Sequence, residues 1–201
     1  AMLYIATGRW PYIAVGVALF AAGSYVLYHL RDHIANRISI WLDPWQDPYD
    51  SGFQLVQSIY AVGGGGLFGQ GLGRGVLLSE SGEPYIPFLE TDFIFSAITH
   101  ELGLAGAAAV VLLYLVFTYR GFRIAMLADD GFSKLLAAGL TATLAIQAFI
   151  IVGGVIGLIP LTGITLPFVS YGGSSIVANF LLLGLLLIVS NHVNQAVERD
   201  R

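Results

Sequence analysis

Three long, strongly apolar runs of the chain contain no charged residue. Residues 10–30, 102–119 and 135–197 are free of Asp, Glu, Lys and Arg. A helix crosses the hydrocarbon core of a bilayer with about 20 mostly apolar residues. The first run therefore predicts one spanning helix, and the second predicts another if residues 93–100 belong to the same helix.

The third run is too long for one helix, and Pro and Gly residues mark where it breaks. Pro160, Gly163 and Pro167 precede the sequence Tyr171-Gly172-Gly173, and both residue types interrupt helices. We therefore expect a re-entrant loop over 160–174 before a last helix. The resulting fold class is an all-α integral membrane protein with a single membrane domain over 1–201, whose four spans cover about 10–30, 93–119, 135–159 and 175–192.

The segment 31–91 between the first two spans is rich in aromatic and aliphatic residues, which argues against disorder. Residues 41–49 contain two Asp-Pro turns between aromatic rings that suit the headgroup level of a membrane. Residues 51–62 predict a short amphipathic helix at the interface. Its apolar face would hold Phe53, Val56, Ile59 and Tyr60, and its other face Gln54, Gln57, Ser58 and Ala61.

A glycine-rich run over 63–75 follows this helix. Gly64-x-Gly66-x-x-Gly69 matches the dinucleotide-binding pattern, but that motif requires a preceding strand, and none is predicted. Two interpretations stay open. The glycines permit close approach of the backbone, or exposed N–H groups and Arg74 face an anionic headgroup.

Composition supports the membrane assignment. Charged residues make up 11% of the chain, against about 25% in typical globular proteins, and the mean hydropathy is +0.77. The net charge of −4 excludes a nucleic-acid footprint, which needs clustered Lys and Arg. The absence of Cys removes disulfides and thiolate chemistry.

The basic residues predict the orientation in the membrane. An even number of spans places both termini on one side, which then holds six basic residues, whereas the other side holds three. By the positive-inside rule the six-residue side is cytoplasmic and 31–91 is extracytoplasmic. The first group is Arg9, Arg120, Arg123, Lys134, Arg199 and Arg201, and the second is Arg31, Arg37 and Arg74.

Two carboxylates near the second span are candidates for chemistry. Thr91 or Asp92 could simply cap the helix N-terminus. If that helix is continuous, Glu101 lies below the interface, where ionisable groups usually mark functional sites, although it could instead be a buried packing residue. The four His are scattered, so the sequence supports no metal cluster.

Several motifs together resemble one family, the RodA/FtsW/SpoVE (SEDS) cell-wall polymerases. Two departures are His100, where many members have Glu, and Ile151, where many have Asn. The matching motifs are Asp43-Pro44-Trp45 through Asp47-Pro48, Gly52-Phe53-Gln54 with Gln57-Ser58, 69–75, Thr91-Asp92-Phe93-Ile94-Phe95, Glu101-Leu102-Gly103, and 160–175 from Pro160 to Ser175.

The resemblance implies a bacterial plasma-membrane protein of about ten helices, of which this chain matches the last four; such a portion alone is expected to be inactive. It implies a peptidoglycan glycosyltransferase that polymerises lipid II in elongation, division or sporulation, with a class B penicillin-binding protein as partner. Asp92 takes the catalytic position. The other expected substrate-binding residues are Gln54, Arg74, Glu101, Ser170 and Ser174.

In this interpretation Asp92 is a general base. The pyrophosphate leaving group would be neutralised by Arg74, by N–H groups from Ser174 onward, or by a divalent cation such as Mg or Mn. Two alternatives stay open: a lipid II flippase that uses Glu101 and a central cavity, and a non-enzymatic scaffold for the transpeptidase.

Overall fold

The computed structural model describes residues 4, 7–73 and 85–199. Arg74, one of the predicted pyrophosphate ligands, lies outside the described residues. Across these residues the chain is helical and contains no strand. The elements are α2 (Pro11–Leu30), α3 (Asp32–Leu42), the short 3-10 helix η1 (Pro44–Gln46), α4 (Phe53–Gly64), α5 (Ile94–Leu127), α6 (Gly131–Val155) and α7 (Gly173–Arg199).

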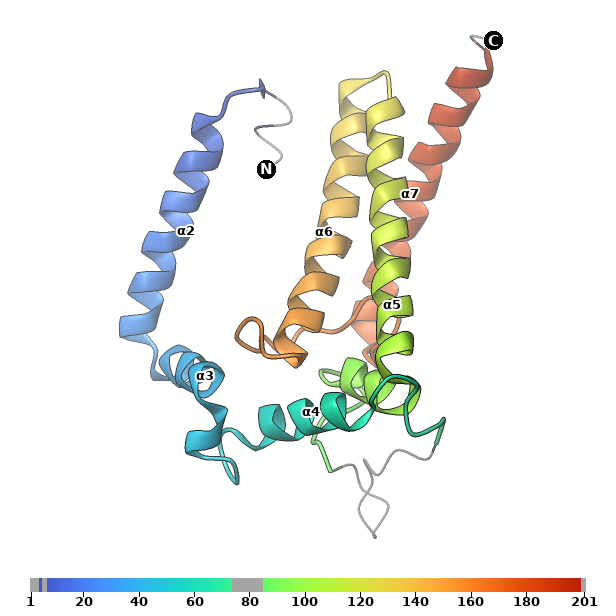
Figure 1. The fold of residues 1–201 in the computed structure, drawn as a ribbon. Coiled ribbons are helices and arrows are strands. Elements are labelled where there is room, and N and C mark those ends of the chain that lie inside the picture. Colours follow the sequence, from blue (N-terminus) through green and yellow to red (C-terminus); the bar gives the residue numbers. More distant parts are fainter. Residues whose placement is uncertain (1–3, 5–6, 74–84, 200–201) are drawn as a thin grey trace.

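Four of these helices are long and apolar enough to cross a membrane, namely α2, α5, α6 and α7. This confirms the predicted all-α membrane fold. Figure 1 shows α5, α6 and α7 side by side, with α2 standing apart and α3 and α4 joining the two parts along one end. We refer to α3, η1, α4 and the loops at this end as the outer layer.

The ends of α5 and α6 differ from those expected, because the positions of charged residues do not determine where these helices begin and end. α6 begins at Gly131, before Lys134, because the Asp130 side chain accepts a hydrogen bond of 2.7 Å from the Ser133 amide. α5 continues past the charged residues 120 and 123 to Leu127. A charge ends the hydrocarbon-facing part of a helix without ending its backbone hydrogen bonding.

Small residues bring α5, α6 and α7 together at the end opposite the outer layer. Gly121 of α5 lies against Thr141 of α6, where a Cβ would come within 2.2 Å of the threonine hydroxyl. Small interfacial residues allow close helix packing in membranes. The buried cluster here consists of Ala125, Ala128, Ala137, Ala138, Leu140, Leu186, Val189 and Val193.

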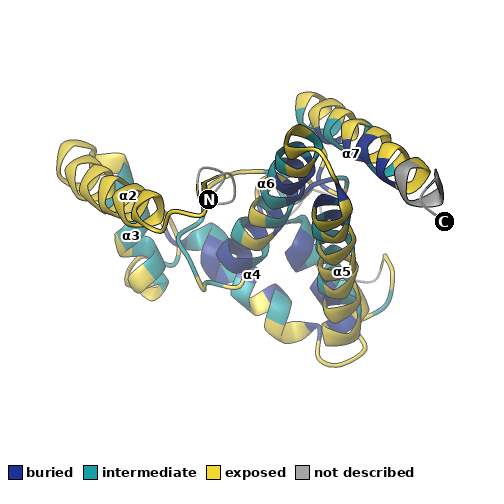
Figure 2. Ribbon diagram, turned by 90° about the horizontal axis from the view of Figure 1, so that it is seen from above, coloured by how far each residue is buried: buried dark blue, intermediate teal, exposed yellow. Residues whose placement is uncertain are grey.

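By contrast, α2 buries none of its residues, and Figure 2 shows it exposed along its whole length. Its apolar side chains are suited to lipid or to other membrane helices.

The α4 helix packs against α5 and α6 with a face that differs from the predicted one. Ser58 and Ala61, expected on the polar face, are buried, whereas Tyr60 is 64% exposed. The Ser58 hydroxyl donates to the Val155 carbonyl and shares a 2.7 Å hydrogen bond with the Ser96 hydroxyl. The predicted face was wrong because hydrogen bonding to α5 and α6 compensates the burial of this polar group.

The glycine-rich run docks onto a break in α5. Gly103 interrupts α5 with φ of 69°, so its flanking residues lack their usual helical partners. The run supplies them: the amides of Gln70 and Gly71 donate to carbonyls 100 and 101, while amides 104 and 105 donate to carbonyls 66 and 67, over 2.9–3.1 Å. This geometry favours close backbone approach over headgroup binding for residues 66–71.

Candidate functional site

Asp92 lies in an irregular segment that leads into α5. The N-cap of α5 is Phe93, without a side-chain capping bond, so the prediction that Thr91 or Asp92 caps this helix is wrong. Phe93 is 1% exposed and anchors the segment in the core. The Asp92 carboxylate is therefore not explained as a cap.

A strained turn precedes Asp92. Phe88 has φ of 61°, a left-handed conformation that bulky residues rarely adopt. Its carbonyl accepts hydrogen bonds from the amides of Thr91 and Asp92, at 3.1 and 3.0 Å, and from the Thr91 hydroxyl at 3.1 Å. Strain of this kind often lies at functional sites, and here it sets the direction in which Asp92 leaves the turn.

The loop between α6 and α7 holds the same segment from the other side. The Ser170 hydroxyl accepts a hydrogen bond from the Leu166 amide and donates to the Thr91 carbonyl. The Tyr171 amide donates to the Glu90 carbonyl at 2.9 Å. Residues 90 and 91 are thus tied directly to the loop, so the position of Asp92 depends on the loop.

Two further hydrogen bonds hold the loop on the helices. The Tyr114 hydroxyl of α5 donates to the Pro167 carbonyl. The side-chain amide of Gln147, on α6, donates to the Thr165 carbonyl at 2.9 Å. Phe168, with φ of 65°, places its ring between those of Phe117 and Phe180. The loop is therefore fixed by α5, α6 and α7 together.

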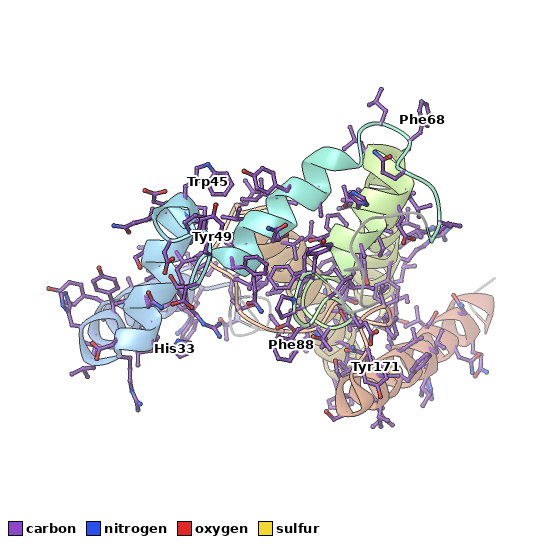
Figure 3. The ribbon with its side chains drawn as sticks, turned by 90° about the horizontal axis from the view of Figure 1, so that it is seen from below. His33, Trp45, Tyr49, Phe68, Phe88 and Tyr171 are labelled. Atoms are coloured by element: carbon purple, nitrogen blue, oxygen red, sulfur yellow. The ribbon has the colours of Figure 1, made fainter. Side chains whose placement is uncertain are left out.

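The Asp92 side chain itself is half-buried. Its Oδ2 lies beside Gly163 of the loop, 3.5 Å from where a Cβ would stand. No hydrogen bond or ion pair joins this carboxylate to another described residue. Figure 3 looks onto the outer layer and shows Phe88 and Tyr171, which flank the segment, on this same face. An unpaired carboxylate in this position is free to accept a proton.

The other predicted site residues are spread over the outer layer. Ser170 is 2% exposed and both bonds of its hydroxyl are internal, so it acts on Thr91 rather than facing a ligand. Ser174 is exposed in the first turn of α7. Glu101 is half-buried and precedes the break at Gly103. The helix is unbroken from Ile94 to Glu101 and is interrupted only two residues later. The place of Glu101 below the interface stays a prediction.

Gln54 lines a cavity of about 220 Å³ between α3, α4 and the loop, and Asp92 is not among the residues that line it. Its amide nitrogen is 3.5 Å from the Pro87 carbonyl. Arg37 lines the same cavity, but it was used only in the count of basic residues that predicts the orientation in the membrane. The missed signal was its position on the apolar side of α3, at helical spacing with Ile34, Ile38 and Trp41.

The described residues include no group of three or more His, Asp or Glu that could hold a metal ion. The divalent cation implied by the resemblance stays a prediction.

The comparisons with known proteins agree on one family. The FtsW/RodA/SpoVE family model, described as "Cell cycle protein", matches residues 1–195. Peptidoglycan glycosyltransferase RodA of Mycobacterium tuberculosis is 48% identical over 94% of this chain and 39% of its own length. Stage V sporulation protein E of Bacillus subtilis is 43% identical over 95% of this chain and 51% of its own. The chain thus spans about two-fifths to one-half of these relatives.

Two solved structures are also similar. One, described as "Structural coordination of polymerization and crosslinking by a peptidoglycan synthase complex", has a TM-score of 0.74 and 27% identity, over 96% of this chain and 53% of the other. The other is a mutant of rod shape-determining protein RodA of Thermus thermophilus, with a TM-score of 0.52 and 24% identity over 94% and 62% of the two chains. The second likeness concerns the fold alone.

Proposed function

Because the chain belongs to the FtsW/RodA/SpoVE family, we propose that it carries the catalytic base of a peptidoglycan glycosyltransferase that polymerises lipid II. The observation that carries the proposal is the Asp92 carboxylate, half-buried on the outer layer and without a partner among the described residues. A capping role for this residue is excluded because Phe93 is the N-cap of α5.

In the proposed reaction a sugar hydroxyl of one substrate attacks the anomeric carbon of the lipid-linked donor. The new glycosidic C–O bond forms as the bond to the pyrophosphate oxygen breaks, and the polyprenyl pyrophosphate leaves with the electron pair. Asp92 accepts the proton of the attacking hydroxyl as that bond forms. The fixed segment 90–92 supplies the orientation that such a transfer needs.

The arrangement of the helices suits amphiphilic substrates. We place the outer layer outside the plasma membrane, with both termini cytoplasmic, because six basic residues share the terminal side. The lipid tails then stay in the bilayer while the sugars meet at the outer layer. A class B penicillin-binding protein is the proposed partner, supported by the similarity to a chain from a peptidoglycan synthase complex.

Substitution Asp92→Asn in the full-length protein tests the proposal. The variant keeps the shape of the side chain but cannot accept a proton, so we expect a loss of lipid II polymerisation of at least about 100-fold. Asp50→Asn is the matched control, because Asp50 is an exposed carboxylate of the same outer layer. An Asp92→Asn protein that still makes glycan at the wild-type rate would contradict the proposal.

A flippase is the second candidate, and the interrupted helix α5 favours it, since discontinuous helices are common in transporters. Liposomes that contain lipid II separate the two functions. A flippase moves headgroups across the bilayer without forming polymer, whereas the proposed enzyme forms polymer. If the wild-type protein neither forms polymer nor moves headgroups, a scaffold role for the partner transpeptidase is the remaining interpretation.

A further inference from the structure

The cavity beside Gln54 has the chemistry of an anion site. Five of its nine lining residues are polar or charged, and the other four are Ile40, Trp41, Leu55 and Leu161; no Asp or Glu among the described residues lines it. α3 contributes His33, Asn36 and Arg37, the region of α4 contributes Ser51 and Gln54, and the loop contributes Leu161.

Arg37 gives the cavity a positive charge that the described residues do not neutralise. Its guanidinium is half-buried and donates one hydrogen bond of 3.0 Å, to the Leu161 carbonyl. A guanidinium has five N–H donors, and no ion pair joins it to a carboxylate of the described chain. Burying a charge without a counter-charge is costly, so an anion bound here would be stabilised.

The neighbouring carboxylates are engaged elsewhere. Asp43 accepts a hydrogen bond from the Trp45 amide, and Asp47 accepts from the amide and the hydroxyl of Ser51. They line a smaller adjacent hollow rather than this cavity. The turns of the two Asp-Pro motifs therefore direct these carboxylates to main-chain and hydroxyl donors of the outer layer, and neither forms an ion pair with Arg37.

One short piece of loop joins the cavity to the proposed catalytic base. Leu161 accepts the bond from Arg37, and Gly163, two residues later, lies against the Asp92 carboxylate. Two residues of extended chain span at most roughly 7 Å. An anion at Arg37 would thus lie close to Asp92 while being held on a separate cation.

We propose that this cavity binds the phosphate or diphosphate group of a lipid, with Arg37 as its charged ligand and Asn36 and Gln54 as neutral donors. The same chemistry has two sources, the diphosphate of the polyprenyl-linked substrate and the phosphate of an anionic phospholipid. The substrate source rests on the proposed function, whereas the phospholipid source does not.

Equilibrium binding to the full-length protein in phosphatidylcholine nanodiscs tests the site. Farnesyl diphosphate is the probe for the substrate source, and added phosphatidylglycerol is the competing probe for the phospholipid source. Two variants perturb the cavity in different ways: Arg37→Gln removes the positive charge, and Asn36→Asp keeps Arg37 and adds a negative charge to the lining. Arg31→Gln is the control, because Arg31 is exposed just before α3 and lies outside the cavity.

We expect each cavity variant to weaken the binding of farnesyl diphosphate at least about tenfold, or about 1.4 kcal/mol, with Arg31→Gln within about twofold of wild type. Phosphatidylglycerol binding that depends on Arg37, without farnesyl diphosphate binding, identifies the phospholipid source. If Arg37→Gln does not fold, the binding of farnesyl diphosphate to Asn36→Asp tests the proposal instead. Binding of both probes that is unchanged by the cavity variants overturns the proposal.

The same preparations separate this proposal from the enzymatic one. Asp92→Asn is expected to bind farnesyl diphosphate within about threefold of wild type while losing polymerisation. Continued polymerisation by Asp92→Asn would refute the role of Asp92 as general base. The binding measurements would then still test whether the cavity binds the anion. Loss of binding in Asp92→Asn, with binding retained in Arg37→Gln, would place the anion elsewhere and refute the cavity.

Discussion

The hydroxyl of Ser170 offers a sharp test of how the loop positions Asp92. Ser170→Ala removes the acceptor of the Leu166 amide and the donor to the Thr91 carbonyl. Leu166 is 1% exposed, so its N–H group is left buried without its partner. A buried donor left unsatisfied costs about 1–3 kcal/mol, and we expect the unfolding free energy to fall by that amount.

The effect on activity should exceed the effect on stability. Without Ser170, residues 90–92 keep only the bond from the Tyr171 amide to the Glu90 carbonyl as a direct hydrogen bond to the loop. A displacement of about 1 Å at a catalytic group can cost about 100-fold in rate. We therefore expect kcat for lipid II polymerisation to fall between about 10-fold and 100-fold, with a smaller change in KM.

The control for this prediction is Ser58→Ala. Ser58 is fully buried and its hydroxyl also makes two hydrogen bonds, to Ser96 and Val155, but none to the loop or to residues 90–92. Thermal unfolding of the full-length protein should report a similar loss of stability for both variants, whereas polymerisation should fail mainly in Ser170→Ala. Equal kcat values in the two variants would refute the positioning role.

Two further predictions concern the scaffold. Gly103→Ala should prevent folding, because its Cβ would come within 2.3 Å of the Gly69 amide nitrogen at a φ of 69°. The control is Gly184→Ala, which places its Cβ in open space on α7 and should fold. The yield of monodisperse protein in detergent measures the effect, and a folded Gly103→Ala variant would contradict the prediction. The hydrogen bond from the Ser133 amide lowers the pKa of Asp130, so its contribution to stability is present above the pKa of the unfolded chain and is lost as pH falls toward the lower folded value. Asp130→Asn should flatten this acid-side dependence of the melting temperature, and an unchanged pH profile would contradict the assignment.

The sequence alone was sufficient for the membrane-spanning helices, whereas Asp92 at the centre of the proposed site stays a prediction. Long apolar runs without charge identify spans directly, because a charged side chain inside lipid is costly whichever helices surround it. The break before α7 followed from Pro and Gly in the same way. Asp92 was assigned through the resemblance of its neighbours to a family, and its spacing alone was equally consistent with a helix cap.

The details that the sequence could not supply depend on contacts between distant segments. The buried hydroxyl of Ser58 is satisfied by Val155, which is 97 residues away, so periodicity within α4 cannot indicate its buried face. Ser170 was expected at the substrate because its motif is distinctive, and its contact with Thr91 spans 79 residues. Arg37 was overlooked because a charge on an amphipathic helix is usually solvated, and its acceptor comes from the distant Leu161.

The junction between residues 66–71 and the interrupted α5 is made entirely by main-chain groups. Hydrogen bonds between main-chain groups depend little on which side chains are present, but they depend on the number of residues between the bonded positions. Inserting or deleting a single residue between the two donor positions and the two acceptor positions of the run would shift the whole reciprocal set out of register. Residues 66–71 should therefore tolerate many substitutions but no change in length. The exceptions are the glycines whose Cβ would clash with the facing backbone.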